Sequence, residues 1–271
     1  MPELPEVETT RRGLEPHVTG RRILALVVRE RRLRWRVATG LPRLLAGQTI
    51  EAAGRRAKYL LLRLTHGTLL WHLGMSGSLR MVPAGLGPDT HDHIDLVLDS
   101  GQAVRFNDPR RFGSLHYVSG DPEAHPLLAQ LAPEPFDDAF DADYLWQITR
   151  GRRAAIKQVL LNSHLVTGVG NIYASEVLFQ AGVRPRRQAG SISRAEVERL
   201  VVAVRDVLGK AIAAGGTTLR DYIDPEGRPG YFKQELFVYD RVGEPCRRCD
   251  TPVRQFIQGQ RSTYYCPACQ H

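Results

Sequence analysis

The chain has 271 residues, with 37 Lys and Arg against 29 Asp and Glu, which gives a formal net charge of +8 and a pI near 9.6. A chain of this length predicts roughly two domains, and the basic balance favours a polyanionic partner, although basicity also serves simple solubility. It shows no secretory leader pattern and no apolar run of membrane length, so a secreted or membrane-spanning protein is not expected and the cytoplasm is.

The charge is unevenly distributed along the chain. Residues 1–120 carry 18 basic and 11 acidic residues, and residues 151–271 carry the same numbers, so each block has a net charge of +7. Residues 121–150 carry seven acids and one arginine, a net charge of −6. Two basic blocks joined by an acidic segment are typical of a protein that grips nucleic acid from two sides.

A candidate nucleophile stands at the start of the chain, Met1-Pro2-Glu3-Leu4-Pro5-Glu6. The small second residue predicts removal of the initiator methionine, which leaves proline as the terminus. A terminal proline is a secondary amine with a pKa of about 8, and its neutral fraction can attack a carbonyl-like carbon to form an iminium. Glu3 and Glu6 would supply adjacent carboxyls for proton transfer. The alternative is structural, since Pro and Glu are favoured in the first turn of any helix.

Short apolar or alternating runs separated by Gly, Asp and Ser turns fill the rest of the first 120 residues. This spacing predicts a β-sandwich after a short opening helix. The expected strands are Ile23–Val28, Tyr59–Leu64, Thr68–Leu73, His93–Leu98, Ala103–Phe106 and Ser114–Val118. The acidic, Pro-rich segment Asp121–Asp143 predicts the domain boundary.

Beyond the linker, apolar residues recur at three- and four-residue steps. The run from Val197 to Ile212 follows a Ser193/Glu196 capping box and predicts an amphipathic core helix. Upstream, a glycine turn leads to a helix that Asn171 is placed to cap. Such a helix start offers free N–H groups to a phosphate, although an ordinary capped turn is equally compatible. The Gly/Pro-rich run 215–230 predicts either a lid or a connector.

All four cysteines lie in the last 26 residues, as Cys246-x-x-Cys249 and, after sixteen intervening residues, Cys266-x-x-Cys269. This spacing predicts one closed four-cysteine zinc site, which folds a small structure and has no open position for catalysis. Two disulfides are the alternative, which a reducing compartment disfavours. Between the pairs, β-prone runs around a glycine predict a hairpin with Arg261 at its tip, either holding a phosphate or simply solvated.

These features predict an α+β protein with four parts. They are a β-sandwich domain at residues 1–120, an acidic linker at 121–150 that leads into the helical region, a basic helical domain at 151–235 and a zinc hairpin at 236–271.

Five motifs follow one another along the chain: Pro2-Glu-Leu-Pro-Glu-Val-Glu8, His72-Leu-Gly-Met-Ser-Gly77, Asp108-Pro-Arg-Arg-Phe-Gly113, Gly168-Val-Gly-Asn-Ile-Tyr173 and the hairpin ending Tyr265-Cys-Pro-Ala-Cys-Gln270. Together they resemble bacterial formamidopyrimidine-DNA glycosylase over residues 2–270. The resemblance implies an N-terminal β-sandwich, a helix–two-turn–helix and one structural Zn²⁺. It also implies a base-excision-repair enzyme that removes 8-oxoguanine and formamidopyrimidines from duplex DNA and, as a lyase, cuts the strand by β,δ-elimination.

The resemblance implies catalytic roles at the chain start and at two cations. Pro2 would attack C1′ of the damaged nucleotide, Glu3 would protonate the opening sugar ring, and Glu6 would orient groups around the pocket. Lys58, one of only four lysines, would hold phosphate and assist β-elimination. Arg261 would grip phosphate and assist δ-elimination.

The DNA-handling residues are also implied by the resemblance. Met75, Arg110 and Phe112 would fill the gap left by an extruded nucleotide, with Arg110 facing the orphaned cytosine. Without the resemblance, Met75 and Phe112 would be assigned to the core. Backbone contacts are implied for His72, His91, Arg153, Lys157 and Asn171. His93 is an alternative to His91, and Arg153 replaces a common lysine with a cation that serves phosphate equally well. Loop 215–230 corresponds to a lid over the damaged base.

Three other functions remain open on the sequence. A sister enzyme resembling endonuclease VIII favours oxidised pyrimidines, whereas Leu4 and the gap-filling residues favour the purine enzyme. A non-catalytic DNA-binding zinc protein explains the charge but gives no reason for a terminal proline beside two glutamates. An RNA-binding module predicts clustered aromatics, which make up only 7% here and are scattered. We expect a bacterial cytoplasmic monomer that binds damaged duplex DNA and no membrane.

Overall fold

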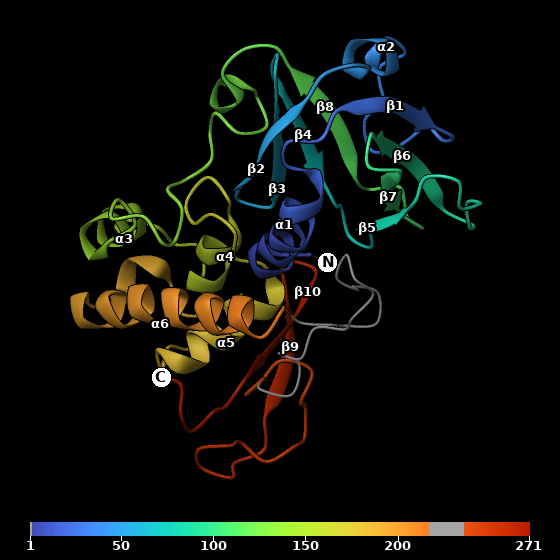
Figure 1. The fold of residues 1–271 in the computed structure, drawn as a ribbon. Helices are drawn as coiled ribbons and strands as arrows, with labels where there is room; N and C mark the ends of the chain where they lie inside the picture. Colours follow the sequence, from blue (N-terminus) through green and yellow to red (C-terminus); the bar gives the residue numbers. More distant parts are fainter. Residues whose placement is uncertain (1, 217–235) are drawn as a thin grey trace. The chain divides into compact units, whose positions relative to one another are not determined.

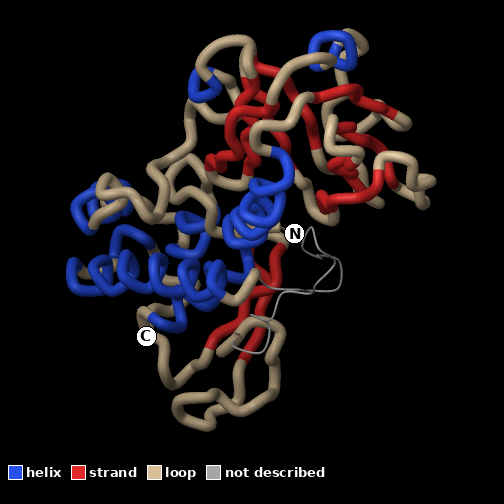
Figure 2. The backbone as a smooth tube through the Cα atoms, in the orientation of Figure 1, coloured by secondary structure: helices blue, strands red, loops and turns tan. Residues whose placement is uncertain are grey.

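The computed structural model describes residues 2–216 and 236–271, and the chain divides into two compact units. Among the described residues, the first unit comprises 2–129 and 212–216, and the second comprises 130–211 and 236–271. Strands predominate in the first unit and helices in the second (Figure 2). The predicted α+β class is therefore confirmed.

The first unit is a β-sandwich preceded by a helix (Figure 1). Its two four-stranded sheets have the orders β1-β6-β7-β5 and β2-β3-β4-β8, and each neighbouring pair is antiparallel. The elements are α1 (Leu4–Val18), β1 (Ile23–Val28), α2 (Leu41–Leu45), β2 (Ile50–Arg56), β3 (Tyr59–Leu64), β4 (Thr68–His72), β5 (Ser78–Pro83), β6 (Asp92–Leu98), β7 (Gln102–Asn107), β8 (Ser114–Val118) and the 3-10 turn η1 (Pro122–Ala124).

All six expected strands form, with bounds within one residue of those predicted. The strands β2 and β5 and the short helix α2 were not predicted. The β2 sequence is rich in Ala, Gly and Arg, and β5 ends in proline, so neither has the β-branched composition that marks a strand locally. These two segments form strands because their backbones pair with β3 and β7, although their own composition does not favour a strand.

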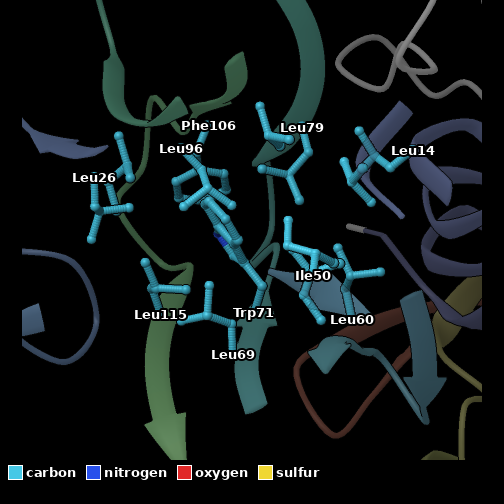
Figure 3. Packing of buried hydrophobic residues seen from close by; sticks show 14 of the residues in the cluster. Leu14, Leu26, Ile50, Leu60, Leu69, Trp71, Leu79, Leu96, Phe106 and Leu115 are labelled. Atoms are coloured by element: carbon cyan, nitrogen blue, oxygen red, sulfur yellow. The ribbon is translucent and has the colours of Figure 1, made fainter. Parts of the chain in front are cut away.

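The apolar faces of the two sheets enclose the core of the first unit (Figure 3). Residues from both sheets and from α1 meet there: Leu14, Leu26, Ile50, Leu60, Leu69, Trp71, Leu79, Leu96, Phe106 and Leu115. Trp71 of β4 meets Phe106 of β7 edge-on, with ring centroids 5.5 Å apart, so this pair joins the two sheets. Replacing either ring by alanine would cost about 3–5 kcal/mol of stability.

Local sequence accounts for the start of α1. Pro5 lies in its first turn, where a missing N–H costs nothing. Glu3 is the N-cap, and its backbone N–H donates to the Glu6 carboxylate at 2.8 Å as half of a capping box. The buried Val7 and Leu14 then attach the helix to the core. The N-terminus is thereby held at a defined place on the sandwich.

The second unit contains the helices and the terminal hairpin. Its elements are α3 (Ala142–Thr149), α4 (Ile156–Leu161), α5 (Asn171–Gln180), the 3-10 turn η2 (Ala189–Ser191), most of α6 (Arg194–Ala213), β9 (Arg254–Gln258) and β10 (Arg261–Tyr265). The predicted capping box of α6 is present, since Ser193 and Glu196 each accept the other's backbone N–H, at 3.3 and 2.8 Å. Among the described helices, none combines the length and apolar character needed to cross a membrane.

The predicted capping role of Asn171 is wrong. The N-cap of α5 is Gly170, in extended conformation, and Asn171 is the first helical residue. Its side chain instead donates from Nδ2 to the Ser262 carbonyl on β10, at 3.0 Å. The hairpin offers an acceptor that the sequence around the helix could not reveal.

Candidate active site and DNA-binding residues

The proposed nucleophile and its two carboxyls lie together at the start of α1. Pro2 is buried, and the residues Glu3 and Glu6 are only 1% and 2% exposed. Gly216, the second residue of the glycine-rich run, approaches Glu6 so closely that a Cβ on it would lie 3.2 Å from Oε1. The rest of the predicted lid, from residue 217, lies outside the described residues. The carboxyls are therefore enclosed by packing, a setting in which proton transfer is shielded from bulk water.

Lys58 and His72 are electrostatically coupled on one sheet of the sandwich. Lys58 lies in the turn between β2 and β3, and His72 ends β4. Burial, followed by the charges of Lys58 and Arg34, lowers the pKa of His72 to about 4. Its Nδ1 accepts the Gly74 N–H at 3.0 Å. The ring is thus neutral at pH 7 with its proton on Nε2, which makes Nε2–H a hydrogen-bond donor.

The three predicted gap-filling residues lie together on two loops. The Arg110 guanidinium is 3.4 Å from the Met75 sulfur, and its carbon stands 5.3 Å from the centre of the Phe112 ring. Met75 and Phe112 are 37% and 45% exposed. The core assignment that composition alone favours for these two residues is therefore wrong. Two exposed apolar side chains flanking a cation match the chemistry of a base-stacking wedge.

Burial separates the two histidines that the sequence left interchangeable. His93 is 8% exposed, and its Nε2 is 2.9 Å from the Asp108 carbonyl. His91 is exposed and has a positive φ of 74°. Only His91 of this pair presents its ring to solvent, so the DNA contact stays assigned to it as a prediction.

The predicted hairpin forms, with a turn at Gly259 and Gln260. Arg261 is exposed at the first position of β10. The next residue, Ser262, accepts hydrogen bonds at its carbonyl from Lys157 Nζ at 3.1 Å and from Asn171 Nδ2 at 3.0 Å. The strand that carries Arg261 is therefore fixed from α4 and α5.

Lys157 itself is only 1% exposed and also donates to the Thr263 hydroxyl at 2.8 Å. This geometry gives the ammonium a role in holding the hairpin, and a direct phosphate contact remains a prediction. Arg153, by contrast, is exposed just before α4.

Glu176 is a site residue that the sequence interpretation missed. It is 2% exposed on α5 and accepts the backbone N–H groups of Phe237, Val238 and Tyr239 at 2.8, 3.0 and 2.8 Å. Burial raises the pKa of Glu176, and the three donors oppose that rise. The sequence signal that would have identified it is a lone acid inside the apolar run of α5. It holds the segment that precedes the cysteine pairs.

The four cysteines form one cluster whose sulfurs all lie within 4.8 Å of one another. Three of the Sγ pairs are 3.4, 3.5 and 3.9 Å apart. Four ligands about 2.3 Å from a tetrahedral zinc would be roughly 3.8 Å apart. Cys246, Cys249, Cys266 and Cys269 therefore fit one structural zinc with no open coordination position.

Comparison with known proteins identifies the family. Family models match in order: the formamidopyrimidine-DNA glycosylase N-terminal domain over residues 1–115, its H2TH domain over 131–222, and a zinc finger found in FPG and IleRS over 243–271. A formamidopyrimidine-DNA glycosylase of Thioalkalivibrio sulfidiphilus is 61% identical over 270 residues, covering all of both chains. The chain belongs to the formamidopyrimidine-DNA glycosylase family.

Solved structures of this family share the fold over the whole chain. The MutM (Fpg) protein of Thermus thermophilus matches with a TM-score of 0.89 and 41% identity, covering 99% of this chain and 98% of that one. The Lactococcus lactis Fpg in complex with DNA containing Fapy-dG matches with a TM-score of 0.92 and 32% identity, covering 99% and 100%. The helix–two-turn–helix and the zinc finger are thus confirmed as family features of this chain.

Proposed function

We propose that this glycosylase removes oxidised purines, namely 8-oxoguanine and formamidopyrimidines, from duplex DNA and then cuts the strand as a lyase. The proposal treats the enzyme as a monomer with its catalytic domain at residues 1–120 and its DNA-binding parts at 151–235 and 236–271. The observation that carries it is the N-terminus, where Pro2, Glu3 and Glu6 are buried together at the start of α1. The Lactococcus lactis relative bound to Fapy-dG DNA supports the choice of lesion.

The first step is displacement of the damaged base. After removal of Met1, the lone pair of the Pro2 nitrogen attacks C1′, and the electrons of the N-glycosidic bond leave with the base, which takes up the proton that the Pro2 nitrogen releases. Glu3 donates its proton to the ring oxygen O4′ as the C1′–O4′ bond opens, which gives an iminium between Pro2 and C1′. Glu6 orients the N-terminus, since its carboxylate accepts the Glu3 N–H.

The second step is strand cleavage. Loss of a proton from C2′ of the iminium expels the 3′ phosphate, and a second elimination expels the 5′ phosphate. Lys58 and Arg261 hold these phosphates and stabilise their departing charge. His72 donates a hydrogen bond from Nε2–H to the DNA backbone. Its lowered pKa supports this role, because the ring is then a neutral donor. His91, Arg153 and Asn171 add backbone contacts.

Met75, Arg110 and Phe112 handle the opposite strand in this proposal. The extruded nucleotide leaves a gap, which the two exposed apolar side chains fill by stacking. The guanidinium between them donates hydrogen bonds to the unpaired cytosine, and adenine offers these donors a poorer match. The proximity of Arg110 to both partners supports one shared function.

Borohydride trapping tests the nucleophile. The enzyme is incubated with a duplex carrying 8-oxoguanine opposite cytosine, the iminium is reduced, and the crosslinked residue is mapped by mass spectrometry. We expect the adduct on Pro2 and its near-complete loss in Pro2→Gly or after an added N-terminal residue. Pro5→Ala, which alters the same helix start but leaves the amine, is the matched control and is expected to trap normally.

Two outcomes contradict the proposal. An adduct on Lys58, or full activity with a blocked N-terminus, would remove Pro2 from the mechanism. Faster excision of an oxidised pyrimidine than of 8-oxoguanine would favour the specificity of the endonuclease VIII type instead.

A further inference from the structure

A buried carboxylate connects the two loops that carry the gap-filling residues. Asp108 is 0% exposed. Its Oδ1 accepts the Ser76 hydroxyl at 3.1 Å, and its Oδ2 accepts the Gly113 backbone N–H at 2.8 Å. Ser76 follows Met75 in one loop, and Gly113 follows Phe112 in the other. One side chain therefore bridges both loops, and its partner Ser76 lies 32 residues before it in the sequence.

The backbone of Asp108 is fixed as firmly as its side chain. Its N–H donates to the His91 carbonyl at 3.0 Å, and its own carbonyl accepts the Arg111 N–H at 3.1 Å and lies 2.9 Å from His93 Nε2. Arg111, between the two proposed DNA-facing residues, has a positive φ of 56°. A non-glycine residue in this region is strained and persists only where its surroundings hold it. Hydrogen bonds to Asp108 thus fix the turn that carries Arg110 and Phe112.

The two loops also touch through backbone that leaves no room for side chains. A Cβ on Gly74 would lie 2.4 Å from the Gly113 nitrogen and from the Phe112 carbonyl carbon. A Cβ on Gly113 would lie 2.8 Å from the His72 carbonyl oxygen and 3.1 Å from Asp108 Oδ2. The loops are therefore packed as one body, and the carboxylate lies at their junction.

We infer that Asp108 is a positioning residue for reading the opposite base, acting through Arg110 with Met75 and Phe112. The inference rests on the function proposed above for these three side chains. Exposed side chains on separate loops can act together at one base pair only if the distance between the loops is fixed. A buried acceptor shared by both loops sets that spacing before DNA binds, so less ordering remains to be done on binding.

Both hydrogen bonds depend on the two oxygen positions of the Asp108 side chain more than on its negative charge. An amide at the same position can accept the Gly113 N–H through its oxygen and donate to the Ser76 hydroxyl through its nitrogen. Asp108→Asn should therefore keep the bridge. Asp108→Ala removes both links, and Ser76→Ala removes only one, while the loop contact through Gly74 remains.

The test measures excision of 8-oxoguanine opposite each of the four bases, together with strand cleavage at an abasic site in single-stranded DNA. The single strand has no opposite base, so it reports on the iminium and elimination steps without any reading of the opposite base. We expect Asp108→Ala to flatten the cytosine-over-adenine ratio by about fivefold or more, the lower range of a lost base-edge contact. Ser76→Ala should flatten it less, and neither should change cleavage of the single strand.

The controls separate positioning from general loss of structure. Asp99→Ala removes an exposed aspartate from the turn between β6 and β7 and should leave both readouts unchanged. Asp108→Asn should keep the opposite-base ratio near that of the parent enzyme. The double variant Asp108→Ala Arg110→Ala should have the ratio of Arg110→Ala alone, because Asp108 acts through that arginine.

The outcomes distinguish this inference from the proposal beneath it. If Arg110→Ala flattens the ratio and folded Asp108→Ala keeps it, the positioning role is wrong while the proposed function stands. If Arg110→Ala keeps the ratio, Arg110 does not read the base, and both fail. Equal loss of the duplex and single-strand activities in Asp108→Ala would show a purely structural residue. Should that variant not fold, Ser76→Ala decides, and an unchanged ratio there overturns the inference.

Discussion

At the scale of single residues, His72 shows how packing sets the state of a side chain. Burial and the neighbouring cations lower its pKa to about 4, and the Gly74 N–H occupies its Nδ1. A histidine beside Lys58 that stayed charged would repel the same cation that the proposed lyase step needs. In the proposed mechanism this neutrality lets both groups contact one phosphate, His72 as a neutral donor and Lys58 as the charge.

The lowered pKa of His72 predicts a pH dependence of folding. An unfolded histidine has a pKa of about 6.5, so the unfolded chain binds a proton at higher pH than the folded one. The stabilisation is fully present above pH 6.5 and is lost as the pH falls toward 4, by on the order of 2–3 kcal/mol. Denaturant unfolding between pH 4 and 7 should show this loss, and His72→Gln should remove it. The exposed His66→Gln is the control and should keep the parent slope.

In the proposed mechanism Arg261 contacts a phosphate, whereas Arg110 reads a base. A phosphate contact carries no base information, so Arg261→Ala should weaken DNA binding equally for all four opposite bases. It should also reduce the slope of log affinity against log salt by about one unit. Titrations at several salt concentrations measure both effects. Arg63→Ala, an exposed arginine on β3, is the charge-matched control. An unchanged salt slope for Arg261→Ala would leave that residue as an ordinary surface cation.

At the scale of elements, buried polar side chains fix segments that have no regular structure. Glu176 of α5 accepts three consecutive backbone N–H groups from residues 237–239. Asn171, on the same helix, donates to the hairpin at Ser262. The helix α5 therefore holds both the segment before the cysteine pairs and the hairpin between them. It thereby fixes the position of the four-cysteine site within the second unit.

Glu176→Gln tests this element. The amide has only one oxygen, and its NH2 group would face a backbone N–H, so at least one buried donor loses its acceptor. We expect a loss of about 2–3 kcal/mol in the free energy of unfolding of this unit. Glu198→Gln removes an exposed carboxylate on α6 and should change stability by less than about 1 kcal/mol. Equal effects of the two variants in denaturant titrations would contradict the stabilising role of the three hydrogen bonds that Glu176 accepts.

At the scale of the whole molecule, the metal and the sandwich stabilise separate parts of the chain. All four cysteines lie in the second unit, and the Trp71 and Phe106 core lies in the first. Zinc binding is coupled to local folding, because the thiolate site does not exist in the unfolded chain. The cluster around Cys246 and Cys266 also packs with Phe179 of α5, so metal loss loosens that helix as well.

Removal of zinc should therefore abolish DNA binding and leave the first unit folded. One equivalent of zinc is expected to copurify, as measured by elemental analysis. After chelation, amide hydrogen exchange should rise across residues 236–271 and stay low in β3, β4 and β7. A Cys249→Ser Cys269→Ser variant that binds DNA as tightly as the parent enzyme would contradict the coupling.

The sequence by itself determined the strand runs, the α6 helix, the cysteine site and the family, because each is written in local spacing or contiguous motifs. It missed β2 and β5, whose pairing partners supply the order that their composition does not. The sequence also left two assignments open for Met75 and Phe112, the core and the surface. A buried and an exposed apolar residue have the same sequence signal, and only the fold shows which residues lie outside the core. Only the tertiary structure decided these assignments. It also showed the bridge at Asp108 and the hydrogen bonds that Glu176 accepts, since a hydrogen bond across many residues depends on where two backbones meet, which no local pattern records.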